Sequence, residues 1–147
     1  MAAIGFYHLT RTKLLAALPP LLGRSLAAGA RILLVAQDPS LLASIDDALW
    51  RSENPDWLPH GMAGGADDAA QPILLSMADH PGNQAGFLFL ADGAPIPLDR
   101  FERVFDLFDG TDPDRVAAAR SRWAAAKQAG HSLTYWRQDE SGWVKAG

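Results

Sequence analysis

The sequence predicts a three-layer α/β/α fold around a mostly parallel sheet. Apolar runs of strand length recur along the chain with helical patterns between them, the alternation that builds such folds. Two runs, 71–77 and 85–92, are continuously apolar, as in strands buried on both faces of a parallel sheet. Because 147 residues with 48% hydrophobic composition are enough for one core, we expect residues 1–147 to form a single domain.

The first elements form a β-α-β unit. Segments 3–9 and 31–37 are apolar runs of strand length, and the segment between them reads as a helix that ends at Gly29. Two consecutive prolines follow Leu18, and prolines fit best in a first helical turn. We therefore expect this helix to begin near Leu18, and the alternative is a longer helix bent at the prolines.

The clearest helix follows the second strand. Asp38 is the expected N-cap and Pro39 occupies the first helical position. Apolar residues then recur with helical spacing through residue 50, at Leu41, Leu42, Ile45, Ala48 and Leu49.

Three elements complete the prediction. Segment 98–110 reads as a helix ended by Gly110, and a longer helix runs from about Pro113 to Gly130. Segment 132–138 reads as the last strand.

Composition excludes several classes of protein. No stretch approaches the roughly 20 apolar residues that cross a bilayer, and the N-terminus lacks the pattern of a signal peptide, so we expect a cytoplasmic protein without a membrane partner. The absence of cysteine excludes disulfides and thiolate chemistry. A net charge of −4 argues against a protein whose main task is strong, direct binding of nucleic acid.

Motifs for enzyme chemistry are missing. The first strand is not followed by a glycine-rich phosphate loop, and no P-loop or Gly-x-Ser-x-Gly elbow occurs. The four histidines lack zinc-ligand spacing, and the adjacent Asp46 and Asp47 fit a solvated helix face. We predict no catalytic, cofactor-binding or metal-binding residue. The alternative is a small α/β enzyme built around His60 and these two carboxylates.

The helix at 113–130 carries the most informative pattern. A single stripe holds Val116, Arg120, Trp123 and Lys127, with Arg115 and Arg122 beside it. Its other side holds small residues that we expect to face the sheet, namely Ala117, Ala118, Ala124, Ala125 and Ala129.

Three interpretations of the stripe remain open. Trp123 can cover the edge of the core while the cations are solvated. It can instead form, with Phe108, an apolar pocket with a cationic rim, which would bind a peptide C-terminus with an apolar last residue and acidic neighbours. The third is a nucleic-acid-binding module in which bases stack on Trp123.

The segment "ALWRSENPDWLPHGMAGG" (48–65), which we expect to form a loop, contains several large apolar side chains. Trp50, Trp57 and Leu58 lie among prolines and glycines that disfavour regular structure. These side chains can cover the protein's own core, surround a catalytic His60, or dock another protein, since tryptophan is enriched at interface hot spots.

Several strings, taken in order, resemble the chi subunit family of bacterial DNA polymerase III. They are "FYHLTRT" (6–12), "IDDALW" (45–50), "WLPHGMAGG" (57–65), "FLFLADGA" (87–94), "FERVFDLFDG" (101–110) and "RWAAAKQAGHSLTYW" (122–136). The resemblance implies a non-enzymatic α/β subunit of the clamp-loader complex. Such subunits bind the acidic C-terminal tail of single-stranded-DNA-binding protein and, through another surface, the psi subunit.

The resemblance also implies binding residues. Tail-binding positions of the family map onto Phe108, Arg120 and Trp123, whereas Val116 and Ala124 stand where better-known members are basic. Our own inference is that Arg115, Arg122 or Lys127 supplies the missing charge. The psi contact of the family corresponds to the region of Trp50, Trp57 and Leu58, which makes His60 either a bystander or a brace for the loop.

Overall fold

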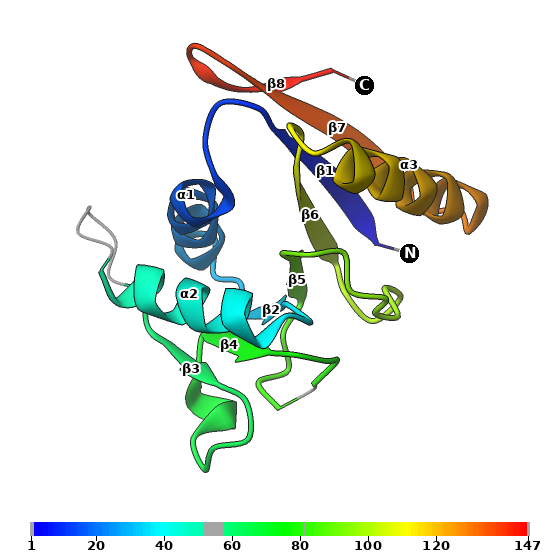
Figure 1. Cartoon of the computed structure of the whole chain (residues 1–147). Coiled ribbons are helices and arrows are strands. Elements are labelled where there is room, and N and C mark those ends of the chain that lie inside the picture. The colour runs from blue at the N-terminus through cyan, green and yellow to red at the C-terminus, as the bar shows by residue number, and fades with distance from the viewer. Residues whose placement is uncertain (1, 52–57, 81, 147) are drawn as a thin grey trace.

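All strands of the chain belong to one sheet in the part that the structure describes. The computed structural model describes residues 2–51, 58–80 and 82–146 (Figure 1). The sheet has eight strands in the order β3-β4-β2-β5-β6-β1-β7-β8. Every neighbouring pair is parallel except β7 and β8. This confirms the predicted mostly parallel α/β fold.

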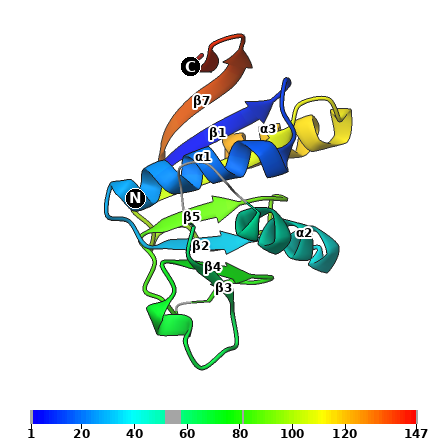
Figure 2. The ribbon, with the colours of Figure 1, turned by 90° about the vertical axis from the view of Figure 1, so that its left-hand side faces the viewer.

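Helices cover both faces of the sheet. Figure 2 shows α1 and α2 in front of the sheet and α3 behind it, with β1, β2 and β5 pointing the same way. The strands are β1 (Ala3–Leu9), β2 (Ile32–Val35), β3 (His60–Met62), β4 (Ile73–Ser76), β5 (Phe87–Leu90), β6 (Arg103–Asp109), β7 (Ser132–Asp139) and β8 (Gly142–Lys145). The helices are α1 (Leu14–Ala27), α2 (Pro39–Trp50) and α3 (Pro113–Gln128), with a 3₁₀ turn η1 (Asp68–Ala70).

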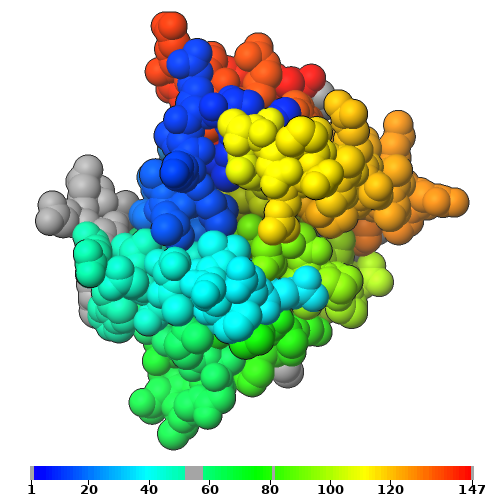
Figure 3. Space-filling model, viewed as in Figure 1, coloured from blue at the N-terminus to red at the C-terminus, as the bar shows by residue number. Residues whose placement is uncertain are grey.

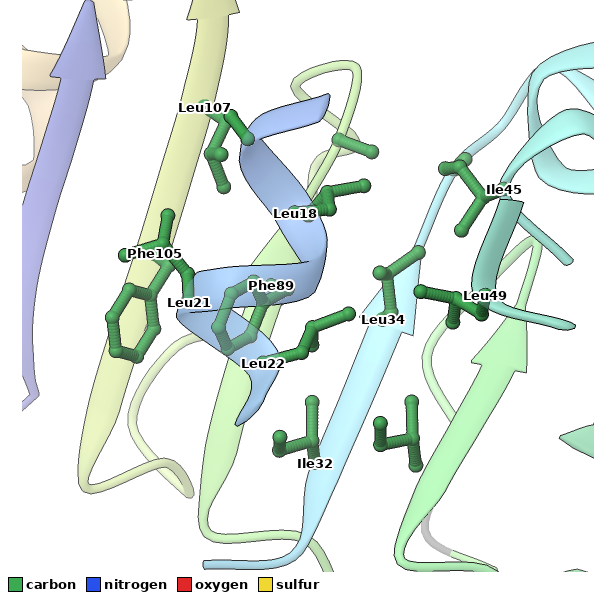
Figure 4. Close-up of a cluster of buried hydrophobic side chains, with 14 of the residues drawn as sticks. Leu18, Leu21, Leu22, Ile32, Leu34, Ile45, Leu49, Phe89, Phe105 and Leu107 are labelled. Atoms are coloured by element: carbon green, nitrogen blue, oxygen red, sulfur yellow. The ribbon is translucent and has the colours of Figure 1, made fainter. Parts of the chain in front are cut away.

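The core on the α1 and α2 face is closely packed. Leu18 and Leu22 of α1 meet Leu34 and Phe89 of the strands, and Ile45 of α2 closes the cluster (Figure 4). These side chains are almost fully buried. Burying a leucine or phenylalanine of this kind stabilises the fold by about 1.5–3 kcal/mol. The predicted core face of α2 is therefore confirmed for Leu42, Ile45 and Leu49.

Aspartates begin two of the helices. The Asp38 carboxylate accepts a hydrogen bond from the Ser40 amide at 2.9 Å, and Pro39 occupies the first position of α2, as predicted. Asp112 does the same for α3 by accepting from Asp114 at 3.0 Å. Both caps satisfy amides that have no partner inside the helix.

The start of α1 differs from the prediction. The helix begins at Leu14, so Pro19 and Pro20 lie inside it and not in its first turn. Two internal prolines remove two backbone hydrogen bonds. Pro19 is half-buried and Pro20 exposed, whereas Leu18 and Leu22 pack in the core, and this packing offsets the loss.

The prediction of a helix at residues 98–110 is wrong. Residues Arg103–Asp109 form β6, which pairs with β1 and β5 in the middle of the sheet. Phe105 and Leu107 face α1, while Val104 and Phe108 face α3. Because both faces are buried, the segment lacks the polar alternation that distinguishes a strand from a helix.

The buried face of α3 also differs from the prediction. The five alanines expected to face the sheet are exposed, and the buried alanines are Ala119 and Ala126. Val116 and Trp123 pack beside them against the sheet. Spacings of three, four and three residues put these four positions on one face, which is the predicted stripe and its flank.

Two short edge strands, β3 and β8, were missed by the sequence analysis. None of the described helices combines the length and apolar character needed to span a bilayer.

Candidate functional site

A cavity of about 240 Å³ lies between α3 and the strands β1, β6 and β7. We call it the α3 cavity, and it is lined by Phe6, His8, Phe108, Val116, Ala119, Arg120, Trp123 and Tyr135. The strand residues share one face of the sheet because side chains alternate, so Phe6 and His8 of β1 both point toward α3. The helix residues share one face because their spacing is three, four and seven.

Aromatic rings form the walls of the α3 cavity. Trp123 packs edge-on against Phe6, with ring centroids 5.2 Å apart, and lies 6.3 Å from Tyr135. His8 stacks on Phe108 at 4.9 Å. These contacts leave Trp123 half-buried, with its ring fixed by the sheet. The result is a preformed apolar hollow.

The polar groups of the α3 cavity are neutral or cationic. Arg120 is exposed at its rim, and the Tyr135 hydroxyl is hydrogen-bonded to Nδ1 of His8. Burial raises the pKa of Tyr135, and the positive charges of Arg120 and Arg137 oppose that shift. No carboxylate is among the lining residues. The cavity therefore suits a ligand that is both apolar and anionic.

Four of the six residues predicted for tail binding meet at this cavity: Phe108, Val116, Arg120 and Trp123. The other two do not line it. Arg115 faces a second, polar cavity together with Asp109 and Asp112, and its charge contributes to the low pKa of Asp109, whose main cause is a hydrogen bond from Thr111. Lys127 is exposed one helical turn beyond Trp123.

Arg122 is engaged inside the protein. Its Nε and Nη2 donate to the two carboxylate oxygens of Asp106 at 2.7 and 2.9 Å. Burial raises the pKa of Asp106, and the guanidinium opposes this. The guanidinium also lies so close to Gly93 that a Cβ there would be 2.5 Å from Nη1. Arg122 is therefore not a free cation for a ligand, contrary to one of our alternatives.

Four cavity residues were missed by the sequence analysis: Phe6, His8, Ala119 and Tyr135. Strand alternation already groups Phe6 with His8, but it does not say which face of the sheet they occupy. That depends on where α3 packs.

The second predicted surface is only partly described. Trp50 is 62% exposed, and its ring lies 4.4 Å from that of His60. Leu58 is 2% exposed and packs in the core, so it does not offer its side chain to a partner. Trp57 lies outside the described residues.

His60 braces this region. Its Nδ1 lies 2.8 Å from the Leu58 carbonyl oxygen, and its Nε2 lies 2.9 Å from Oδ1 of Asp46 on α2. The side chain is 0% exposed and both nitrogens are occupied, which leaves none to act on a substrate. Among the described residues, no cluster of histidine and acidic side chains could hold a metal ion.

A family model described as "DNA polymerase III chi subunit, HolC" matches residues 1–134. The chain belongs to this family. The DNA polymerase III subunit chi of Pseudomonas aeruginosa is 28% identical over 106 residues, which cover 71% of this chain and 72% of that protein. Membership in the chi family supports an accessory role in DNA replication and confirms the resemblance seen in the sequence.

Proposed function

We propose that this chain is a non-catalytic adaptor of the DNA polymerase III clamp-loader complex, acting in the cytoplasm, and that the α3 cavity binds the acidic C-terminal tail of single-stranded-DNA-binding protein. One observation carries the proposal: the cavity has aromatic walls, an arginine at its rim and no carboxylate among the described residues that line it. An apolar side chain at a peptide's end fits the hollow, and its carboxylates are attracted to the rim.

Arg120 is the main anion-binding group in this proposal. Arg122 is already neutralised by Asp106, and Arg115 lies among aspartates on another cavity. Arg120 has no ion-pair partner among the described residues. A guanidinium can bind a carboxylate with two parallel hydrogen bonds. Binding should therefore depend strongly on this one side chain.

The second partner is the psi subunit, bound through the surface around Trp50. An exposed tryptophan of this kind provides a large apolar contact area in protein interfaces. We assign Trp57, which lies outside the described residues, to the same contact. Leu58 and His60 support this surface from beneath. Binding both partners would link the replicase to single-stranded template coated with its binding protein.

The experiment that tests tail binding is a calorimetric titration with an acidic peptide ending in phenylalanine. We expect a dissociation constant in the micromolar range. Removing the terminal phenylalanine should weaken binding by at least about tenfold, because the cavity loses its apolar ligand. Raising the salt concentration should weaken it further by screening Arg120. Equal affinity for the truncated peptide would disprove that the cavity holds the terminal side chain.

An oligonucleotide of similar charge serves as the control ligand. We expect it to bind more weakly than the peptide, since Trp123 is half-buried and the net charge of −4 disfavours a polyanion. Tighter binding of the oligonucleotide would favour the nucleic-acid alternative.

A further inference from the structure

The α3 cavity contains a polar pair that the proposed function does not use. β1 pairs in parallel with β7, with Phe6 opposite Tyr135 and His8 opposite Arg137, so His8 and Tyr135 are diagonal neighbours on the sheet. The Tyr135 hydroxyl and Nδ1 of His8 are hydrogen-bonded, and the two rings meet edge to face at 5.8 Å. Both side chains line the cavity. A polar pair inside an otherwise aromatic hollow can orient a polar ligand group.

The hydrogen bond has two directions. When Nδ1 of His8 carries no hydrogen, the Tyr135 hydroxyl donates to it and has no hydrogen left for a ligand. When Nδ1 carries a hydrogen, in the neutral Nδ1–H tautomer or in the protonated imidazole, it donates to the Tyr135 oxygen, and the hydroxyl hydrogen can point into the cavity. Because burial raises the pKa of Tyr135, the phenol keeps its hydrogen at neutral pH. A hydrogen on Nδ1 of His8 therefore decides whether Tyr135 can donate to a ligand, and the protonated imidazole always carries one.

The described charged groups around the pair are cations, apart from an aspartate that is already paired. Arg120 on α3 and Arg137 on β7 act on Tyr135 as positive charges. On β6, Asp106 is paired with Arg122, and Phe108 is the strand partner of His8. None of the described residues that line the cavity is a carboxylate that could balance a protonated imidazole. A ligand carboxylate would supply that balance.

We propose that His8 and Tyr135 form a second carboxylate-binding group of the α3 cavity, in which His8 takes up a proton when an acidic peptide binds. Nδ1 of His8 then donates to the Tyr135 oxygen, and the Tyr135 hydroxyl donates to a peptide carboxylate beside Arg120. This inference rests on the proposed function. Binding is then coupled to protonation and is tighter at mildly acidic pH, since histidine side chains titrate between about pH 5 and 8.

The test is calorimetry at about pH 6 and about pH 8, each in two buffers that differ in their enthalpy of protonation. The probe is a synthetic, N-acetylated, aspartate-rich peptide ending in phenylalanine, whose carboxylates stay ionised at both pH values. We expect the wild-type protein to bind the peptide about fivefold more tightly at the lower pH. We also expect it to take up a fraction of a proton on binding, which the comparison of the two buffers measures.

Three variants separate the roles. His8→Gln keeps a polar partner for Tyr135, but glutamine does not titrate. The peptide affinity of this variant should therefore be nearly the same at the two pH values. Tyr135→Phe removes only the hydroxyl and should lose about fivefold affinity at the lower pH and less at the higher pH. His80→Gln changes a histidine outside the cavity and should behave like the wild type. Circular dichroism melts confirm that each variant is folded.

The outcomes are distinct. Wild-type binding without proton uptake, or uptake retained in His8→Gln, overturns this inference and leaves the proposed function standing. If the folded wild-type protein binds the peptide at neither pH, the proposed function and this inference fail together.

Discussion

Arg122 and Asp106 set the rotation of α3 about its axis. Asp106 is buried in the face of β6 that also carries Phe108, and Arg122 precedes Trp123 on the helix. The two hydrogen bonds between them therefore fix how Trp123 stands opposite Phe108. A buried ion pair adds little net stability, but it makes the loss of either partner costly.

Arg122→Met should destabilise the protein by about 3 kcal/mol at neutral pH, because it leaves the buried Asp106 carboxylate without a counter-charge. Burial raises the pKa of Asp106 above 3.8, so its protonated form is favoured in the fold and stability is lost as the pH rises through the folded pKa. The deficit of the variant should therefore shrink as the pH falls toward 4. Urea unfolding at several pH values measures it, and a deficit independent of pH would contradict this account.

Gly110 is required by the ring of His8. A Cβ at this position would overlap the imidazole, and it would lie 2.8 Å from the Leu9 carbonyl oxygen. Gly110→Ala should cost about 1–3 kcal/mol, in the range of overpacked cores, and should displace His8 from the α3 cavity. Thermal unfolding and peptide titration check the two effects, with Gly65→Ala, where a Cβ meets nothing closer than 3.7 Å, as the control. Equal stability of the two variants would count against the steric argument.

At the scale of elements, α3 approaches the sheet through small residues and leaves the cavity beside them. Ala119 is buried and lines the α3 cavity, whereas its neighbour Ala118 is exposed. The position of the binding site thus depends on which alanines face the sheet. That choice follows from the packing of α3 and not from its composition.

Ala119→Leu should fill the α3 cavity and weaken peptide binding by at least about tenfold, since the added methyl groups occupy the space of the ligand's apolar side chain. Ala118→Leu is the matched control and should bind like the wild type. Calorimetry with the same peptide gives both affinities. Weaker binding by Ala118→Leu than by Ala119→Leu would mean that the opposite helix face binds the ligand.

The sequence was sufficient for elements whose signals are local. Asp38 with Pro39 marks the start of α2, and the stripe on α3 already groups Val116, Arg120 and Trp123. The strand at 103–109 was not predictable, because burial on both faces removes its alternation. The role of Arg122 was not predictable either, because its partner lies on a segment that reads as a helix. His8 and Tyr135 come together only through the pairing of the first and seventh strands.

At the scale of the whole molecule, the two proposed surfaces lie at different ends of the sheet. The α3 cavity involves β6, β1 and β7, whereas Trp50 ends α2 next to the edge strand β3. Strands β4, β2 and β5 separate the two regions. Figure 3 shows α2 in cyan and α3 in yellow to orange on separate parts of the surface. The two proposed surfaces therefore do not overlap.

Trp50→Ala should weaken binding of the psi subunit by at least about tenfold, as expected for an interface tryptophan, and leave peptide affinity unchanged within about twofold. The ring is exposed, so its removal should affect stability little. Titrating each ligand in the presence and absence of the other measures any coupling. A large change in peptide affinity would contradict the separation of the two surfaces.

The most direct measurement compares the peptide affinities of Arg120→Ala and Arg115→Ala. Both are exposed arginines on α3, but only Arg120 lines the α3 cavity. The account predicts that Arg120→Ala weakens binding at least about tenfold, the worth of a charged hydrogen-bonded pair, while Arg115→Ala changes it less than about threefold. Equal losses in the two variants would mean that the peptide responds to the general charge of the helix, and the α3 cavity would not be its binding site.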